Sequence, residues 1–131
     1  MAELTRSYVR REAAQARAYS QAVITEGGRT IWLAGQVAIE DSAGRSLADN
    51  LDGQVREVFA RLERTLEEAG AKLSDMVTMT VFLIDARYTT RMTELRTELF
   101  GKDFPASAAI TVQGFAQPEM MIEVQGIAVA E

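Results

Sequence analysis

One segment, residues 51–69, constrains the fold most, because large apolar residues recur along it at helical spacing. The apolar positions are Leu51, Val55, Val58, Phe59, Leu62, Leu66 and Ala69. A period near 3.6 places them on one side of an α-helix, which another element must cover. Asp49 or Asn50 suits the N-cap, and Gly70 suits the position just past the C-terminus. The segment therefore predicts a long amphipathic helix packed on a sheet.

The other side of this helix is charged and is predicted to be solvated rather than a docking patch. Its members are Arg56, Glu57, Arg61, Glu63, Arg64, Glu67 and Glu68. The pairs Glu57–Arg61 and Arg64–Glu68 are spaced i, i+4, and each adds a few tenths of a kcal/mol. Burial of the apolar side, at about 1.5–3 kcal/mol for each large side chain, dominates the stability of the helix.

Further elements follow from β-branched runs and turn residues. Strands are predicted at residues 5–10, 19–25 and 30–34, with glycines at 27 and 28 supplying positive φ between the last two. Trp32 is predicted to lie in the core.

The second half of the chain begins with a long β-branched strand over residues 75–85. Met76 and Met79 are interpreted as packing residues in it. A second helix is predicted over residues 89–100, with Met92, Leu95, Leu99 and Phe100 facing inward.

Two alternating runs on either side of residues 114–118 predict a closing β-hairpin with a longer loop. Ala108, Ile110 and Val112 would share a face with Ile122 and Val124 if the register allows it. The opposite alternation carries Ser107, Thr111, Gln113, Glu123 and Gln125. A carboxylate in mid-strand costs desolvation energy unless it has partners, so Glu123 is the first candidate for chemistry. Thr111, Gln113 and Gln125 are interpreted as polar interface residues rather than catalysts.

Composition limits the chemistry. The 131 residues include no cysteine and no histidine, which excludes thiol nucleophiles, Ser-His triads, disulfides and nearly all zinc or iron sites. The net charge of −5 and the scattered arginines argue against nucleic-acid binding. No apolar run is long enough for a membrane span, and the stretch from Met1 to Arg6 lacks a signal-peptide core. We expect a cytoplasmic protein.

The predicted element order is β-β-α-β-α-β-β in one domain, residues 1–131. This order indicates an α+β fold in which helices cover a mixed sheet, since strands separated by helices are parallel or non-adjacent.

Four segments together resemble the reactive intermediate deaminase (Rid, YjgF) family. They are Tyr19-Ser20-Gln21-Ala22-Val23, Trp32-Leu33-Ala34-Gly35-Gln36, the run from Met76 to Asp85, and Phe104-Pro105-Ala106 followed by Ile122-Glu123-Val124. The resemblance implies a chorismate-mutase-like fold with two helices on one face of the sheet. It also implies a homotrimer with small-molecule clefts between subunits. Active members hydrolyse 2-imino or enamino acids to 2-oxo acids and ammonia without a metal or organic cofactor.

Carried over position by position, the resemblance makes Glu123 the residue that positions water, Tyr19 a cleft wall and Gly35 a backbone contact to the ligand. Other positions depart from the family pattern. Ser107 stands where active members carry a carboxylate-binding arginine, and Ala109 stands where a cysteine is frequent. Ala34 stands in place of a serine, and Thr93 stands where an asparagine is common. Ser107, Thr93, Gly35, Arg17 and Ala109 are the predicted substrate-binding residues.

Loss of a bidentate arginine is expected to weaken carboxylate binding about 10- to 100-fold, because charge-assisted hydrogen bonds are the stronger ones. Arg17 is the candidate replacement; alternatively it is only an exposed charge. Tyr19 could instead be a packing aromatic, and Glu123 could pair with a subunit neighbour for structure alone. The resemblance favours an enamine or imine deaminase with altered substrate specificity. The alternatives are a trimer that binds or senses a metabolite without catalysis, and an interaction module.

Overall fold

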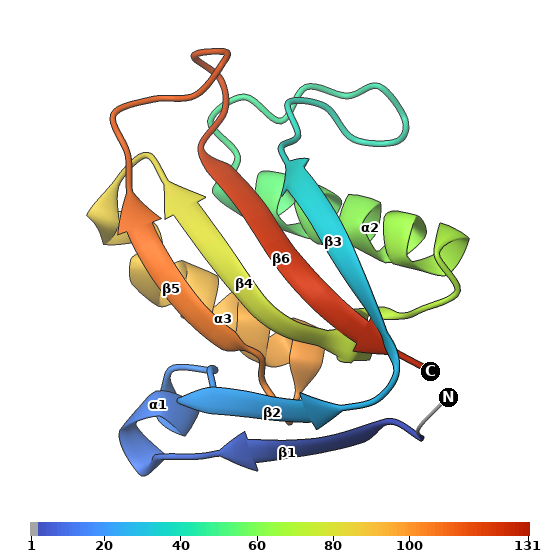
Figure 1. The fold of residues 1–131 in the computed structure, drawn as a ribbon. Coiled ribbons are helices and arrows are strands. Elements are labelled where there is room, and N and C mark those ends of the chain that lie inside the picture. The colour runs from blue at the N-terminus through green and yellow to red at the C-terminus, as the bar shows by residue number, and fades with distance from the viewer. Residues whose placement is uncertain (1–2) are drawn as a thin grey trace.

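The computed structural model describes residues 3–131, so the first two residues of the N-terminal stretch lie outside it. The chain forms an α+β fold with a mixed sheet (Figure 1). The strands are β1 (Thr5–Val9), β2 (Ala22–Glu26), β3 (Arg29–Gln36), β4 (Met76–Leu83), β5 (Ala106–Thr111) and β6 (Ile122–Ala130). The helices are α1 (Glu12–Ala16), α2 (Leu51–Glu68) and α3 (Thr89–Phe100), with 3-10 turns at Leu73–Asp75 and Ala86–Tyr88.

The main sheet has the strand order β3-β6-β4-β5 (Figure 1). Strand β6 runs antiparallel to both β3 and β4, whereas β4 and β5 are parallel. The predicted C-terminal hairpin is therefore wrong: both of its strands exist, but β4 lies between them. Alternation of apolar and polar residues predicts a strand but does not predict which strand it pairs with. The long loop between β5 and β6 allows the chain to pass the end of β4.

The register also corrects the predicted faces of β5 and β6. Phe82 of β4 pairs with Ile110 on one side and with Glu123 on the other. Paired residues on adjacent strands point to the same face of a sheet. Ile110 therefore shares the face of Glu123, and the expected grouping of Ile110 with Ile122 and Val124 is wrong.

One face of the main sheet is covered by α2 and α3, which lie behind it in Figure 1. The core is made between these layers, and both predicted packing methionines belong to it. Its fully enclosed members include Val58, Phe59, Leu62, Leu66, Met76, Met79, Val81, Leu83, Met92, Leu95, Ile122 and Val124. The two predicted helices are confirmed, including the inward positions of Met92 and Leu95.

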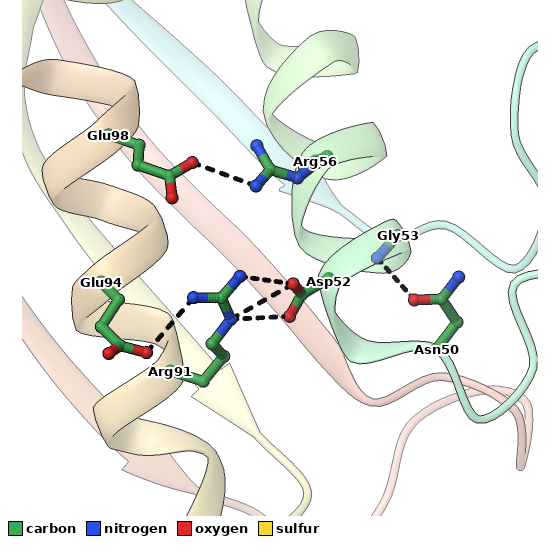
Figure 2. Close-up of polar contacts among 7 residues, drawn as sticks. All are labelled: Asn50, Asp52, Gly53, Arg56, Arg91, Glu94 and Glu98. Carbon is green, nitrogen blue, oxygen red and sulfur yellow. Dashed lines mark hydrogen bonds and ion pairs between the residues drawn. The ribbon is translucent and has the colours of Figure 1, made fainter.

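The α2 termini follow the predicted pattern. The Asn50 side-chain oxygen accepts a hydrogen bond from the Gly53 backbone nitrogen at 2.8 Å, which makes Asn50 the N-cap (Figure 2). Gly70 follows the C-cap with a φ of +76°. The charged side of α2 differs from the prediction at Glu57, which is buried and pairs with Arg61 at 3.6 Å and Arg64 at 3.5 Å. Two arginines thus compensate a carboxylate that was expected in solvent.

Ion pairs connect the two long helices along their outer side (Figure 2). Arg91 of α3 contacts both carboxylate oxygens of Asp52 in α2, with the shortest distance 2.6 Å, and also contacts Glu94 at 3.2 Å. Arg56 of α2 contacts Glu98 of α3 at 3.0 Å. All of these side chains are partly solvated, so the pairs position the helices more than they stabilise them.

The N-terminal part forms a separate two-stranded antiparallel sheet, β1 with β2. Strand β1 confirms the predicted strand at residues 5–10. Strand β2 is shorter than predicted and begins at Ala22, because residues 17–20 form the turn after α1, a short helix that the sequence reasoning missed. Gly27 and Gly28 both have a φ of +76°, as predicted for the turn before β3.

The other face of the main sheet is covered by no helix or strand of the residues that the structure describes (Figure 1). It carries Trp32, which is 77% exposed, so the predicted core position of this residue is wrong. The alternation of β3 turns Leu33 into the core and Trp32 away from it. We call this side of the sheet the open face. Its side chains belong to Trp32, Thr78, Thr80, Phe82, Ala108, Ile110, Glu123, Gln125 and Ile127.

A buried glutamine fixes the segment that leads into β6. The Gln54 amide donates to the Leu47 and Glu119 carbonyl oxygens at 3.0 and 2.8 Å. Its side-chain oxygen accepts from the Met121 backbone nitrogen at 2.8 Å. These bonds hold the start of β6, two residues before Glu123, against α2. Across residues 3–131, no helix combines the length and apolarity that a bilayer span requires.

Candidate functional site

Glu123 lies on the open face, where β6 pairs with β4. Its side chain is half-buried and packs over Gly35, and a Cβ added at Gly35 would collide with the Glu123 carboxylate. Among residues 3–131, no hydrogen-bond or ion-pair partner contacts this carboxylate. Gly35 therefore provides the space that the Glu123 side chain occupies, and the carboxylate oxygens keep their capacity to accept hydrogen bonds.

The open face is also hollowed, although neither Glu123 nor Gly35 lines the hollow. A cavity of about 360 Å³ is lined by residues of β3, β4 and β6, including Trp32, Ala34, Thr80 and Gln125. A second hollow of about 700 Å³ lies elsewhere, between β1, the end of α3 and the C-terminus, and none of the predicted site residues lines it. Size alone would select the second hollow, but the first lies on the face that carries Glu123, and its lining includes Ala34, next to Gly35, and Gln125, two residues after Glu123.

A second group of predicted residues gathers where the α1–β2 turn meets the start of β5. The Ser20 backbone nitrogen donates to the Pro105 carbonyl at 3.1 Å, and Ser20 forms a bridge with Ala106. This contact brings the half-buried Tyr19 close to Ser107. Sequence reasoning predicted Tyr19 at a strand start; it lies instead in the turn before β2.

That turn contains a strained residue. Ala18 is fully buried and has a φ of +62°, a left-handed conformation that disfavours a Cβ. The Ala18 nitrogen donates to the Gln15 carbonyl at 3.0 Å, and the Tyr19 nitrogen donates to the Ala14 carbonyl at 3.1 Å. This is the Schellman pattern that ends helices, normally with glycine in the place of Ala18. The turn fixes the directions in which Arg17 and Tyr19 leave the helix.

The residue that joins this group is Arg96 of α3, which sequence reasoning missed. One terminal nitrogen, Nη1, donates to the Ser107 hydroxyl at 2.8 Å, and Nη2 donates to the Arg17 carbonyl oxygen at 3.0 Å. Arg96 is only 5% exposed, and its buried Nε has no partner within the described residues. Arg96 lies four residues after Met92 and three before Leu99, so its helical spacing placed it on the inward face.

The electrostatics of Arg96 are those of a buried cation. Burial and, to a smaller extent, the nearby Arg17 charge together lower the pKa of its guanidinium to about 10, and Tyr19 opposes this shift. Arg96 therefore keeps its charge at neutral pH despite the desolvation. The Arg17 side chain, the predicted replacement cation, is exposed, and Arg17 contacts Arg96 only through its backbone carbonyl.

The two remaining predicted residues lie beside this group. Thr93 is half-buried on α3, one turn before Arg96, and Ala109 is exposed on β5, two residues beyond Ser107. Thr93 thus lies on the helix that carries Arg96, and Ala109 lies on the strand that carries Ser107. Within residues 3–131 no cluster of three or more potential metal-ligating side chains is present.

The predicted residues thus form two groups on opposite faces of the main sheet. Glu123 and Gly35 lie at the open face. Ser107 pairs with the buried Met79 and contacts α3, so it points to the helix-covered face. Side chains on opposite faces of one sheet cannot line a common pocket, so a site that uses both groups needs two copies of the chain.

Comparison with known proteins agrees with this fold. The sequence model of the family described as endoribonuclease L-PSP matches residues 10–130. The chain belongs to this family, which includes the Rid (YjgF) proteins. The match covers all the predicted site residues.

Individual relatives span most of the chain. A RutC family protein of Pyrococcus abyssi is 35% identical over 113 residues, which cover 86% of this chain and 87% of that protein. A human 2-iminobutanoate/2-iminopropanoate deaminase is 28% identical over 111 residues, covering 85% of this chain and 79% of the enzyme. The crystal structure of the Rid-family protein YyfB from Yersinia pestis superposes with a TM-score of 0.83 at 27% identity, covering 95% of this chain and 98% of that one.

Proposed function

We propose that this protein is a hydrolytic deaminase of small imines or enamines, acting in clefts that two copies of a homotrimer build together. The trimer would have a chorismate-mutase-like arrangement, with the open faces inside and the helices outside. The main support is the half-buried Glu123 carboxylate over Gly35, which has no partner among residues 3–131 and lies on the same sheet face as a hollow of about 360 Å³. Deaminases among the relatives make an imine the natural first substrate to test.

The reaction needs only groups that the chain supplies. The Glu123 carboxylate accepts a hydrogen bond from a water molecule, whose oxygen attacks the imine carbon. A C–O bond forms while the C=N π electrons and a proton go to nitrogen. The resulting carbinolamine loses ammonia, and the carbon becomes the carbonyl of a 2-oxo acid. With no histidine or cysteine in the chain, a carboxylate is the best placed general base.

The shared cleft is supported by the division of the predicted residues between two faces of the sheet. A second copy packed against the open face would bring the edge of its own sheet at β5, with Tyr19 and Ser107, toward Glu123 of the first. Trp32 and Ile110 are large apolar side chains exposed on this face, at 77% and 45%. Burial of such side chains is what favours association.

Nucleic acid is a poor substrate for this surface, although the family description refers to an endoribonuclease. The net charge is −5, and phosphate backbones are bound by clustered cations. A small metabolite, no cofactor and a cytoplasmic location complete the proposal.

The test is hydrolysis of 2-iminopropionate and 2-iminobutyrate, generated in situ by an amino-acid oxidase, with 2-oxo acid and ammonia as readouts. We expect acceleration over buffer and its loss by about 100-fold or more in Glu123→Gln, because general-base catalysis contributes on this scale. Glu119→Gln, which neutralises an exposed carboxylate on the preceding loop, is the matched control and should keep full activity. No acceleration by the wild type, or equal acceleration by Glu123→Gln, would refute the proposal.

A second candidate function is metabolite binding without turnover. It is favoured by one observation, the serine at position 107 where active relatives are expected to carry an arginine. Saturable binding of a 2-oxo acid by a protein that does not accelerate imine hydrolysis would support it.

A further inference from the structure

Arg96 is a buried cation without an anion. A guanidinium has five N–H donors, and residues 3–131 accept two hydrogen bonds from it, at Ser107 and at the Arg17 carbonyl. No carboxylate of these residues forms an ion pair with it. Buried charges are normally paired, because desolvation costs several kcal/mol. An anion from outside these residues would complete the environment of Arg96.

The Ser107 hydroxyl is oriented by this arginine. Its oxygen accepts from Arg96 Nη1 at 2.8 Å, which leaves the hydroxyl hydrogen free to donate elsewhere. A hydroxyl that accepts from a cation becomes a stronger donor, since hydrogen bonds in a chain polarise one another. Ser107 is half-buried at the edge strand, with the small, exposed Ala109 next on the same face. No large side chain at position 109 therefore closes off that side of the hydroxyl.

We propose that the Arg96–Ser107 pair is the carboxylate-recognition element of this site, with Ser107 touching the ligand and Arg96 acting as the positioning residue behind it. The cation that the chain lacks at position 107 is thus supplied from α3. The ligand class is a small carboxylate, such as a 2-oxo or 2-imino acid. This inference rests on the proposed function for the location of the cleft but not for its chemistry.

The exposed Arg17 fits this assignment. Its charge lies close enough to Arg96 to lower the pKa of that guanidinium, so the two cations raise the local positive potential together. An anion bound at Ser107 would relieve their repulsion. A neutral ligand would not.

The test compares two probes of one shape, pyruvate and its neutral amide pyruvamide, by calorimetric or NMR titration. The wild type should prefer pyruvate. In Arg96→Met the affinity for pyruvate should fall about 10- to 100-fold while that for pyruvamide is nearly unchanged, since a charge-assisted hydrogen bond is lost. Arg96→Lys should restore part of the preference, because it keeps the charge without the fork. Inorganic phosphate as a third probe shows whether the site prefers a carboxylate over another oxyanion, and tighter binding of phosphate would overturn the ligand class.

Two further variants separate a structural role from recognition. Ser107→Ala leaves Arg96 in place and should still reduce the pyruvate preference several-fold. Arg91→Met removes a guanidinium from the same helix, where it pairs with Asp52 and Glu94, and should leave the preference unchanged. If Arg96→Met fails to fold, Arg96→Lys and Ser107→Ala carry the test.

A pyruvate preference unchanged in Arg96→Lys, Arg96→Met and Ser107→Ala would overturn the inference. So would weaker association of copies in Arg96→Met with unaltered pyruvate binding, which would mean that a neighbouring copy supplies the anion. If the protein hydrolyses imines but Arg96 plays no part in the preference for pyruvate over pyruvamide, this inference is refuted and the proposed function stands. If pyruvate binding depends on Arg96 but the protein does not hydrolyse imines, the proposed function is refuted and this inference stands.

Discussion

The two faces of the main sheet share the same strands but have different surroundings. On the covered face, Met79, Val81 and Val124 are enclosed by α2 and α3 (Figure 1). On the open face, Trp32 and Gln125 are exposed, and Glu123 is half-buried with no partner in the described part of the chain. The covered face is complete within one chain, whereas the open face has large apolar and unpaired polar groups that remain to be satisfied. The first face stabilises the fold, and the second is available for association and chemistry.

The largest expected effect is on the covered face. Leu62→Ala should lower the free energy of unfolding by about 2–5 kcal/mol, because it leaves a cavity between α2 and the sheet. Urea denaturation at one protein concentration measures it. Leu51→Ala, at the half-buried start of the same helix, is the control and should cost clearly less. Equal losses at both positions would show that burial does not distinguish them.

An intermediate effect is expected at the open face, and it concerns association rather than folding. Trp32→Ser should leave the far-UV circular dichroism unchanged but weaken self-association by about 30-fold or more, since central aromatic residues contribute 2 kcal/mol or more to interfaces. Sedimentation velocity over a concentration series measures it. The unfolding midpoint should also lose its dependence on protein concentration.

The control for Trp32→Ser is Ile24→Ser. Ile24 is 52% exposed but belongs to the two-stranded sheet, away from the open face. It should leave association intact. A wild type that sediments as a monomer would contradict both the prediction and the shared cleft.

The smallest expected effect is at the solvated edge of the covering helices (Figure 2). Hydrogen bonds from Arg91 hold the pKa of Asp52 below its ordinary value, with the nearby charges of Arg91 and Arg56 acting in the same direction. Asp52→Asn should lower stability at pH 7 by less than about 1 kcal/mol, because water screens the pair. Urea denaturation at several pH values measures the difference.

The sign of the pH dependence follows from the lowered pKa. The folded state favours the ionised carboxylate, so its contribution is present above the unfolded pKa near 3.8 and is lost as the pH falls through the folded value. The difference between wild type and Asp52→Asn should therefore begin to shrink below about pH 4 and vanish only when the pH is below the lowered pKa of the folded state. Glu63→Gln, on the exposed side of α2, should show no such change. A difference that persists at low pH would mean that the charge is not its source.

Much of the fold could be predicted from local patterns. The α2 apolar stripe and its N-cap, the bounds of α3, and the β4 strand all follow from periodicity and end signals that lie within one element. The errors concern relations between elements. The hairpin was predicted between neighbouring segments, but β6 pairs with β4 and β3 instead. Chain order does not reveal which edges meet.

The candidate site could be predicted only where a local pattern identifies the residue. Glu123 was identified from the cost of a carboxylate in mid-strand, a property of one residue and its neighbours. Arg96 had a signal in its helical spacing, but the meaning of that signal depends on Ser107, eleven positions away. The core position predicted for Trp32 is wrong because alternation separates the two faces of a strand but does not predict that one face of the sheet is left uncovered.

The sequence by itself determined the two long helices with their apolar sides, the segments that form strands, and which catalytic chemistries are impossible without cysteine and histidine. The tertiary structure alone decided the strand order, the exposure of Trp32 and the meeting of Arg96 with Ser107. The physical reason is the distance along the chain over which each kind of interaction acts. Periodicity and capping act within a few residues, whereas pairing and burial depend on contacts between segments far apart in the chain.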